Sequence, residues 1–283
     1  MSLPPPPRCQ VELAERVLCA FLREETQKVG FQRAVLGLSG GIDSALVVEL
    51  AARAIGPEQV LAVAMPYRTS HPDSLRLAEE SAAHAGVALE VVDISDAADA
   101  HMAAVPGLAE DMSELGKLRK GNIMSRTRMI TLFDRSARDH ALVYGTSNKT
   151  ELMLGYGTIY GDMASGINPI GDLYKSQVYA LSRHLGVPQE IVDRAPSADL
   201  WEGQTDEDEI GHSYDTVDAY LHYSIDRRFN RSELIRLGFE PELIDRLQRR
   251  VRHNQYKRRP PIIAKLAART VNLDYRYARD WGV

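Results

Sequence analysis

The chain has 283 residues, of which 44% are hydrophobic and 26% are charged. These proportions are typical of a soluble globular protein and exclude a largely disordered chain. The 34 Lys and Arg residues against 39 Asp and Glu residues give a net charge of −5, which argues against nucleic-acid binding driven by overall charge.

The two cysteines, Cys9 and Cys19, both lie near the N-terminus. Two cysteines are too few for a disulfide framework or a cysteine zinc site, and we interpret them as reduced thiols. No apolar run reaches the ~20 residues of a membrane span, and the charges within residues 11–22 argue against a secretory signal. We therefore expect a cytoplasmic protein that binds neither nucleic acid nor a membrane.

The Pro-rich start of the chain, residues 1–9, is expected to be flexible, and residues 11–22 have the spacing of an amphipathic helix. Farther along, four short apolar runs predict strands at residues 34–38, 60–65, 88–94 and 141–144. Segments of helical composition alternate with them at residues 45–55, 72–85 and 176–185. Nearly continuous apolar strands separated by helices predict a doubly wound α/β fold, in which a parallel sheet has helices on both faces.

The composition changes after residue 195. Residues 201–210 are acidic and contain glycine, and we predict a mobile loop over residues 199–212. Residues 246–259 are strongly basic, and most of them are expected on a solvated helix face. Neither segment is long enough for a separate domain, so we predict a single domain over residues 1–283.

The most informative stretch, residues 39–44, follows the first predicted strand and precedes a helix. It reads Ser-Gly-Gly-Ile-Asp-Ser. Two glycines allow backbone N–H groups to approach an anion, and two serine hydroxyls and the helix N-terminus add to a cradle for phosphate. Asp43 would repel phosphate unless a Mg²⁺ ion lay between them. The alternative is an ordinary serine-capped turn between a strand and a helix.

The stretch lacks the Gly-Lys-Ser/Thr of a Walker A loop and the Gly-x-Gly-x-x-Gly of a dinucleotide site. It resembles the pyrophosphate loop of the N-type ATP pyrophosphatases, which cleave ATP between the α and β phosphates. Further stretches, in order, resemble the NAD synthetases of that superfamily, and the similarity runs from about residue 10 to 265. They are residues 121–129, 145–151, 160–162 through 168–175, and 195–200 with 256–261.

The resemblance implies an adenine nucleotide alpha-hydrolase-like fold with a five-stranded parallel sheet. It also implies the amidation of deamido-NAD to NAD. In that reaction the nicotinate carboxylate attacks the α-phosphate of ATP, pyrophosphate leaves, and ammonia displaces AMP from the adenylated intermediate. Members of the family are homodimers, so we expect a homodimer.

The same resemblance implies roles for individual residues. The catalytic residues would be Asp43 and Lys175, and the Mg²⁺ ligands Asp43 and Glu151. Arg126 and Lys257 would contact deamido-NAD. The expected ATP contacts are Ser39, Gly40, Gly41, Ile42, Asp43, Ser44, Ala45, Met65, Thr146, Lys175 and Ser197.

Three positions depart from the ammonia-using members of the family. Ile159 and Gly166 stand where a lysine and an aspartate often contact deamido-NAD, and Tyr256 replaces a common histidine. Residues 155–164 look more like the synthetase half of the glutamine-using enzymes. The synthetase-like segment nevertheless begins by residue 35, which leaves no room for a fused amidase domain. We expect free ammonia as the nitrogen donor, unless a separate amidase subunit supplies it.

Two other classes remain open. One is a different enzyme of the superfamily, either tRNA-thiolating or GMP-forming, although the acidic charge and the positions of the cysteines count against the first. The other is a nucleotide-binding module without catalysis. The joint presence of Asp43, Glu151 and Lys175 would serve no purpose in such a module.

Overall fold

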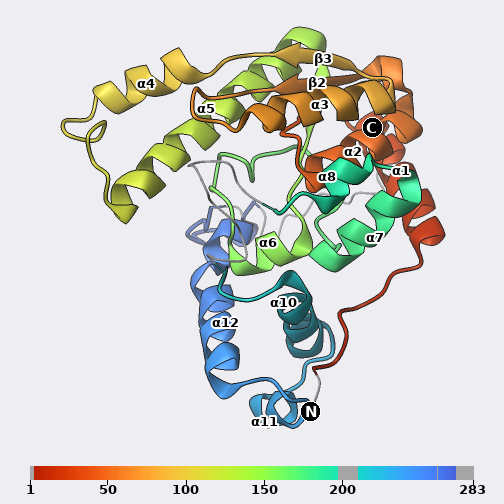
Figure 1. Cartoon of the computed structure of the whole chain (residues 1–283), viewed down its shortest axis with the longest axis vertical. Helices are drawn as coiled ribbons and strands as arrows, with labels where there is room; N and C mark the ends of the chain where they lie inside the picture. Colours follow the sequence, from red (N-terminus) through yellow and green to blue (C-terminus); the bar gives the residue numbers. More distant parts are fainter. Residues whose placement is uncertain (1–2, 197–209, 260, 272–283) are drawn as a thin grey trace.

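The computed structural model describes residues 3–196, 210–259 and 261–271 (Figure 1). A parallel sheet carries helices on both faces, and a separate group of helices lies below the sheet in this view. The predicted α/β fold is therefore confirmed. Within the described ranges, no helix is long and apolar enough to cross a membrane.

The described sheet has the strand order β3-β2-β1-β4, and every neighbouring pair is parallel. Its strands are β1 (Arg33–Gly37), β2 (Val60–Ala64), β3 (Ala88–Val91) and β4 (Ala141–Tyr144). In the register, Ala34 lies beside Val60 on one side and Leu142 on the other. The central position of β1 places the loop that follows it in the middle of the carboxyl edge.

The expectation of five strands is not confirmed, since the described residues form four. Beyond β4, Ile167 makes only an isolated parallel bridge with Tyr144. Pro169, two residues later, has no backbone N–H to donate to a ladder, so the pairing does not continue as a strand there.

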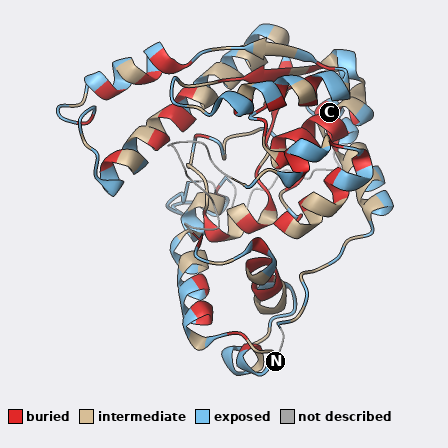
Figure 2. Cartoon of the chain, in the orientation of Figure 1, coloured by how far each residue is buried: buried red, intermediate tan, exposed pale blue. Residues whose placement is uncertain are grey.

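Alternating strand residues bury their side chains on opposite faces of the sheet. Figure 2 shows buried residues in the strands and in the helices beside them. Leu36 belongs to the cluster on one face and Val35 to the cluster on the other. The first face packs against α1 (Val11–Lys28), α2 (Ile42–Ile55), α3 (Pro72–Ala85), α7 (Lys175–Leu185) and α8 (Gln189–Asp193). The second face packs against α4 (Ser95–Ala103) and α5 (Glu114–Asp139). A short 3-10 turn, η1 (Pro57–Gln59), leads into β2.

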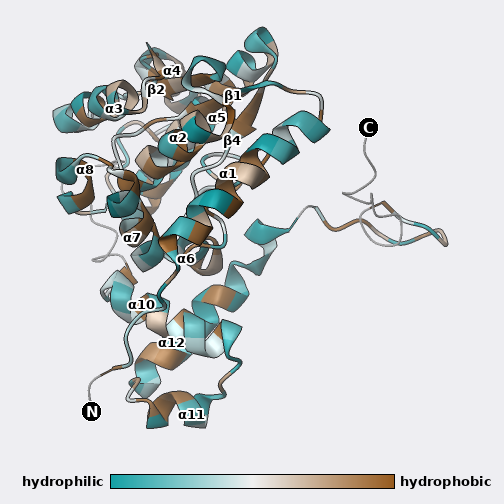
Figure 3. Cartoon of the chain, turned by 90° about the vertical axis from the view of Figure 1, so that its right-hand side faces the viewer, coloured by the Kyte–Doolittle hydropathy of each residue, from teal (hydrophilic) through white to brown (hydrophobic). Residues whose placement is uncertain are grey.

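A third hydrophobic cluster lies among the helices below the sheet. Its elements, which we call the helical group, are α6 (Lys149–Leu154), α10 (Tyr214–Leu221), the π-helical turn η2 (His222–Asp226), α11 (Arg231–Arg236), α12 (Pro241–His253) and the 3-10 turn η3 (Gln255–Arg258). Tyr220 and Phe239 meet edge to face in this cluster, with ring centroids 6.0 Å apart. After η3, residues 261–271 form an extended segment that leads away from the helical group (Figure 3).

The predicted strands agree with the structure to within one residue, except that β3 ends at Val91 rather than at residue 94. The helix predicted over residues 72–85 coincides with α3, whereas α2 begins three residues earlier than predicted. The predicted mobile loop lies outside the described residues apart from 210–212, where Ile210 is buried. Residues 3–9 have no regular secondary structure, and their flexibility stays a prediction.

Candidate active site

A cavity of about 760 Å³ opens at the carboxyl edge of the sheet. The residues that end β1, β2 and β4 form its floor, and α5 forms one wall. Residues 155–162 and the turn η3 contribute the part toward the helical group. This edge is where parallel α/β sheets bind their ligands, so the cavity is the candidate active site.

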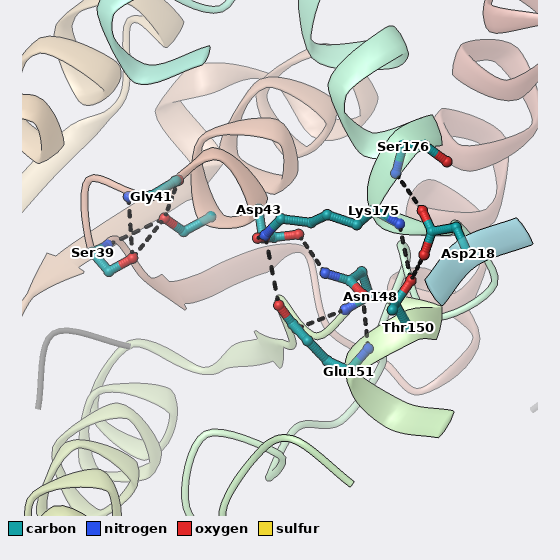
Figure 4. Close-up of polar contacts among 10 residues, drawn as sticks. Ser39, Gly41, Asp43, Asn148, Thr150, Glu151, Lys175, Ser176 and Asp218 are labelled. Carbon is teal, nitrogen blue, oxygen red and sulfur yellow. Dashed lines mark hydrogen bonds and ion pairs between the residues drawn. The ribbon is translucent and has the colours of Figure 1, made fainter. Parts of the chain in front are cut away.

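The loop over residues 39–44 is held by its own serines (Figure 4). The Ser44 hydroxyl donates to the Gly41 carbonyl at 3.0 Å and accepts the Ser39 N–H at 3.2 Å. The Gly41 N–H in turn donates to Ser39 Oγ at 3.3 Å. These bonds fold the backbone into a tight turn at the start of α2. Ser39, Gly41, Ile42, Asp43 and Ser44 all line the cavity, as the predicted phosphate loop requires.

Two of the expected ATP contacts, Gly40 and Ala45, do not line the cavity. Gly40 has φ +76°, and a Cβ on it would come within 2.3 Å of the Ser74 carbonyl oxygen, so only glycine fits there. The side chain of Ala45 is completely buried in the core beneath the loop. Gly40 and Ala45 thus shape the loop, and neither lines the cavity in the structure.

The side chains of Asp43, Glu151 and Lys175 meet at the cavity (Figure 4). The Lys175 ammonium forms an ion pair with Asp43 Oδ2 and lies 3.7 Å from Glu151 Oε1. Only 2% of the Lys175 side chain is exposed, so this charge depends on the two carboxylates. The three residues come from the starts of α2, α6 and α7, which converge here.

Asn148 fixes both carboxylates, a role that the sequence did not predict. Its Nδ2 donates to Asp43 Oδ1 at 2.9 Å, and its Oδ1 accepts the Glu151 N–H at 3.0 Å. The Asn148 N–H donates back to Glu151 Oε2 at 3.1 Å, which completes a capping box at the start of α6. The signal was present, because Asn148 lies inside the stretch 145–151 that resembles the NAD synthetases.

Met65, Thr146 and Ser197 are the remaining residues expected to contact ATP. Met65 directly follows β2 and lines the cavity, and its carbonyl accepts the Arg128 Nε–H at 2.9 Å. Thr146 follows β4 and lines the cavity. Ser197 lies outside the described residues. Arg194, which was not a predicted site residue, lines the same cavity and donates to Ser74 Oγ at 2.8 Å. It stands immediately before the matched stretch 195–200.

The two residues expected to contact deamido-NAD both line the cavity. Arg126 donates to the Ile159 carbonyl at 3.3 Å. Asp162 also lines the cavity, which the sequence did not predict. Its Oδ1 accepts from Ser125 Oγ at 2.6 Å and from the Thr158 N–H at 2.9 Å, which closes the segment 158–162 over α5.

Lys257 is engaged with the chain itself. Its ammonium donates to the carbonyls of Gly155 and Gly157, both at 2.8 Å. Burial lowers the pKa of Lys257, and the charge of Asp162 partly opposes that effect. The predicted substrate lysine therefore also holds the backbone of one cavity wall.

Gly166, one of the departures from the family pattern, is closely packed. A Cβ on Gly166 would come within 2.5 Å of Leu142 Cδ1, because the segment packs directly on β4. A side chain at this position would therefore require the Leu142 side chain to move. The contact that an aspartate would make there must come from another residue or be missing.

The comparisons with known proteins agree with the site. The NAD synthase family model matches residues 14–261. An NH(3)-dependent NAD(+) synthetase of Chlorobium phaeobacteroides (strain BS1) is 54% identical over 269 residues, which cover 95% of each chain.

Two solved structures are also similar. The NH3-dependent NAD synthetase of Campylobacter jejuni, in complex with the nitrate ion, has a TM-score of 0.76 and 35% identity over 91% of this chain and 100% of that one. An NMN synthetase of Francisella tularensis has a TM-score of 0.78 and 28% identity over 90% of this chain and 99% of that one. With a family match over most of its length and relatives at about half identity, this chain belongs to the NAD synthase family.

Proposed function

We propose that this chain catalyses the ATP-dependent amidation of deamido-NAD to NAD, with ammonia as the nitrogen donor. The observation that carries the proposal is the buried ammonium of Lys175, which faces Asp43 and Glu151 beside the glycine-rich loop. A mere nucleotide-binding module has no use for such a charge cluster at the phosphate end of its cavity. The family match favours this reaction over the other enzymes of the superfamily.

The reaction needs charge neutralisation around the α-phosphorus. A bond forms between a nicotinate carboxylate oxygen and this phosphorus, and the bond to the bridging oxygen of pyrophosphate breaks. Negative charge gathers on the phosphate oxygens as this happens. We assign the loop over residues 39–44 to the departing pyrophosphate and Lys175 to the phosphate charge. Ammonia then forms the C–N bond, loses a proton, and AMP leaves with the carboxyl oxygen.

The donor set fits a Mg²⁺ ion held by Asp43 and Glu151. Both carboxylates already face one cation, the Lys175 ammonium, and oxygen ligands suit Mg²⁺. In the described part of the chain, no group of three or more His, Cys, Asp or Glu side chains could hold a metal ion. Two protein ligands leave the other positions to phosphate and water, which is the usual arrangement for this ion. When bound, the ion would supply further neutralisation of the phosphate charge.

Arg126 and Lys257 are proposed to bind deamido-NAD. They come from α5 and η3, line the same cavity as the charge cluster, and both bring positive charge to an anionic substrate. The carbonyl bonds of Lys257 fix its position without removing its charge.

A homodimer and a cytoplasmic location are part of the same proposal. The first half of α5 exposes Leu115 and Leu118, at 63% and 54%, and Leu118 also lines the cavity. An apolar face of this kind suits a subunit contact beside the substrate site. The two cysteines are free, as a reducing compartment requires.

One end-point assay tests the proposal. The purified chain is incubated with MgATP, ammonium and deamido-NAD, and NAD and AMP are quantified by mass spectrometry. Equal amounts of NAD and AMP are the expected result. A parallel tube contains deamido-NMN in place of deamido-NAD, because an NMN synthetase shares the fold. Amidation of deamido-NMN alone would overturn the substrate, and no AMP in either tube would overturn the reaction.

A further inference from the structure

Asp218 is a buried carboxylate of the helical group that the reaction described above does not use. It lies in the middle of α10 and is completely buried. Among the described residues, no cation lies within ion-pair distance of it. Burial raises the pKa of Asp218, while hydrogen bonds from Thr150 and Ser176 oppose that effect. A carboxylate without a counter-ion in this position is costly, so its hydrogen bonds demand an explanation.

The two hydrogen bonds of Asp218 go to two different helices of the site (Figure 4). Its Oδ1 accepts from Thr150 Oγ at 2.6 Å, at the start of α6. Its Oδ2 accepts from the Ser176 N–H at 2.7 Å, at the start of α7. Thr150 immediately precedes Glu151, and Ser176 immediately follows Lys175. One side chain therefore holds the neighbours of both charged residues.

Thr150 adds a second link between these helices. Its hydroxyl oxygen accepts the Lys175 N–H at 3.0 Å. A hydroxyl has a single hydrogen to donate, and that of Thr150 is donated to Asp218. The direction of both hydrogen bonds is thereby fixed: the Lys175 N–H donates to Thr150 Oγ, and the Thr150 O–H donates to Asp218. Thr150 is completely buried, so water does not compete for these bonds.

A second residue of α10 meets the other end of Lys175. The Lys175 ammonium lies 5.2 Å from the ring centroid of Tyr214, which is buried. Tyr214 and Asp218 are four residues apart and so lie on one face of the helix. This face of α10 thus touches Lys175 at its ammonium and, through Thr150, at its backbone.

We propose that Asp218 is a positioning residue that sets the separation of Lys175 and Glu151, acting through Thr150 and Ser176. It ties the helical group to the charge cluster, so that the cluster is held from below the sheet as well as from the glycine-rich loop. The proposal rests on the catalytic and metal-binding roles that we assigned to Lys175 and Glu151 above.

The first test is Asp218→Asn, which keeps the shape of the side chain. The asparagine can accept one of the two hydrogen bonds, but its amide group cannot accept the other. We expect kcat to fall about 10- to 100-fold and the half-saturating Mg²⁺ concentration to rise, as for other residues that orient ligands. The KM for deamido-NAD should not change, because the hydrogen bonds that hold Arg126 and Lys257 go to the carbonyls of Ile159, Gly155 and Gly157 and not to Asp218 or its two partners.

A second pair of variants covers the case in which Asp218→Asn does not fold. Thr150→Val removes the hydroxyl at nearly constant shape, and Thr150→Ser restores it. The valine variant should show the same shifts in kcat and Mg²⁺ dependence, and the serine variant should recover wild-type values. Thr26→Val is the matched control, because Thr26 is equally buried and its hydroxyl bonds to Tyr144 at 2.5 Å. Its Mg²⁺ dependence should stay that of the wild type.

The outcomes separate the possible explanations. A merely structural role of Asp218 would lower the folded fraction and leave the half-saturating Mg²⁺ concentration unchanged. That result, or an unaltered Mg²⁺ dependence in Thr150→Val, would overturn the proposal. Lys175→Met and Glu151→Gln are measured in parallel. If both retain full activity, the roles proposed for the charge cluster fail, whatever Asp218 does.

Discussion

At the scale of single residues, Asp43 joins two parts of the site. One of its carboxylate oxygens accepts from Asn148 and the other pairs with Lys175, so it connects the glycine-rich loop to the starts of α6 and α7. An asparagine would preserve the volume of the side chain and remove its charge. The residue therefore allows charge and packing to be separated experimentally.

We predict that Asp43→Asn folds normally and loses about 100- to 1,000-fold in kcat, the usual cost of removing one element of a preorganised charged site. We expect the loss because the variant lacks one of the two proposed Mg²⁺ ligands and leaves one carboxylate instead of two facing Lys175. The measurement is steady-state NAD formation together with a thermal melt. Asp96→Asn serves as the control, since that carboxylate is fully exposed. An active Asp43→Asn enzyme would refute the assignment.

Arg126 allows the two substrates to be tested separately. Its guanidinium is exposed in the cavity and donates to the Ile159 carbonyl. We predict that Arg126→Met raises the KM for deamido-NAD by roughly 10- to 100-fold, the equivalent of one hydrogen bond to a charged group. The KM for ATP should stay unchanged. Arg119→Met, on the same helix but not in the cavity lining, is the control. A rise in the KM for ATP alone would place Arg126 on the other substrate.

Some residues of the site could be predicted from the sequence and others could not. The glycine-rich loop was predictable because its residues are adjacent, and its chemistry follows from their types. The bonds of Lys257 were not, because they join backbone carbonyls about a hundred residues away in the chain. The close contact of Gly166 with Leu142 was not predictable either, because it joins two segments that are separate in the chain.

At the scale of elements, the basic run over residues 246–259 holds the end of helix α6, a role that its composition does not predict. Arg250 and Asn254 donate to the Leu154 carbonyl, and Arg258 donates to the carbonyls of Leu152 and Met153. These carbonyls lie at the end of the short helix α6, where the N–H groups of a further helical turn are missing, and that of Leu152 also accepts the Gly155 N–H at 3.3 Å. The expectation of a mostly solvated face was therefore wrong for these side chains, which anchor α12 and η3 to the site.

Helix α5, with 26 residues, was not predicted as a helix, because many charged residues interrupt its apolar pattern. It is joined to the sheet by charge as well as by packing. Glu90 of β3 accepts from Arg135 at 2.7 Å and from Arg138 at 3.1 Å. The bonds from these arginines, Arg135 foremost, hold the pKa of Glu90 below its ordinary value of 4.5.

Because the pKa of Glu90 is lowered in the folded protein, the free energy of unfolding should depend on pH. The contribution of Glu90 to the free energy of unfolding is present above pH 4.5 and is lost as the pH falls through the lowered pKa. Glu90→Gln should cost about 0.5–1 kcal/mol at neutral pH, the range of partly exposed ion pairs. The cost should shrink as the pH drops below 4.5. Urea denaturation at both pH values measures it, with the exposed Glu24→Gln as control, and a constant cost would contradict the assignment.

At the scale of the whole molecule, the site lies where three hydrophobic clusters meet. Two of them flank the sheet, and the third fills the helical group. Lys175 begins a helix of the first cluster, whereas Asp218 belongs to a helix of the third. The predicted alternation of strands and helices was enough for the sheet. It could not reveal the helical group, whose contacts with the site are long-range. That the whole chain is one domain stays a prediction.

The nitrogen donor is also a property of the whole chain. A glutamine amidase of the Glu-Lys-Cys kind needs a reactive thiolate, and a reactive cysteine has a lowered pKa. Cys9 and Cys19 are the only cysteines of the chain, and burial raises the pKa of both thiols. The nearby Glu15 raises that of Cys19 further. Both thiols are therefore poor nucleophiles at neutral pH.

We accordingly predict that the purified chain forms NAD with ammonium and not with glutamine. Two tubes with MgATP and deamido-NAD, one with each nitrogen source, give the measurement by mass spectrometry of NAD and glutamate. The double variant Cys9→Ser and Cys19→Ser should keep full activity with ammonium, because neither thiol takes part. Glutamate formation that disappears in the double variant would show instead that one of these thiols hydrolyses glutamine. AMP without NAD in the glutamine tube would mean that adenylation proceeds but that amidation needs added ammonia.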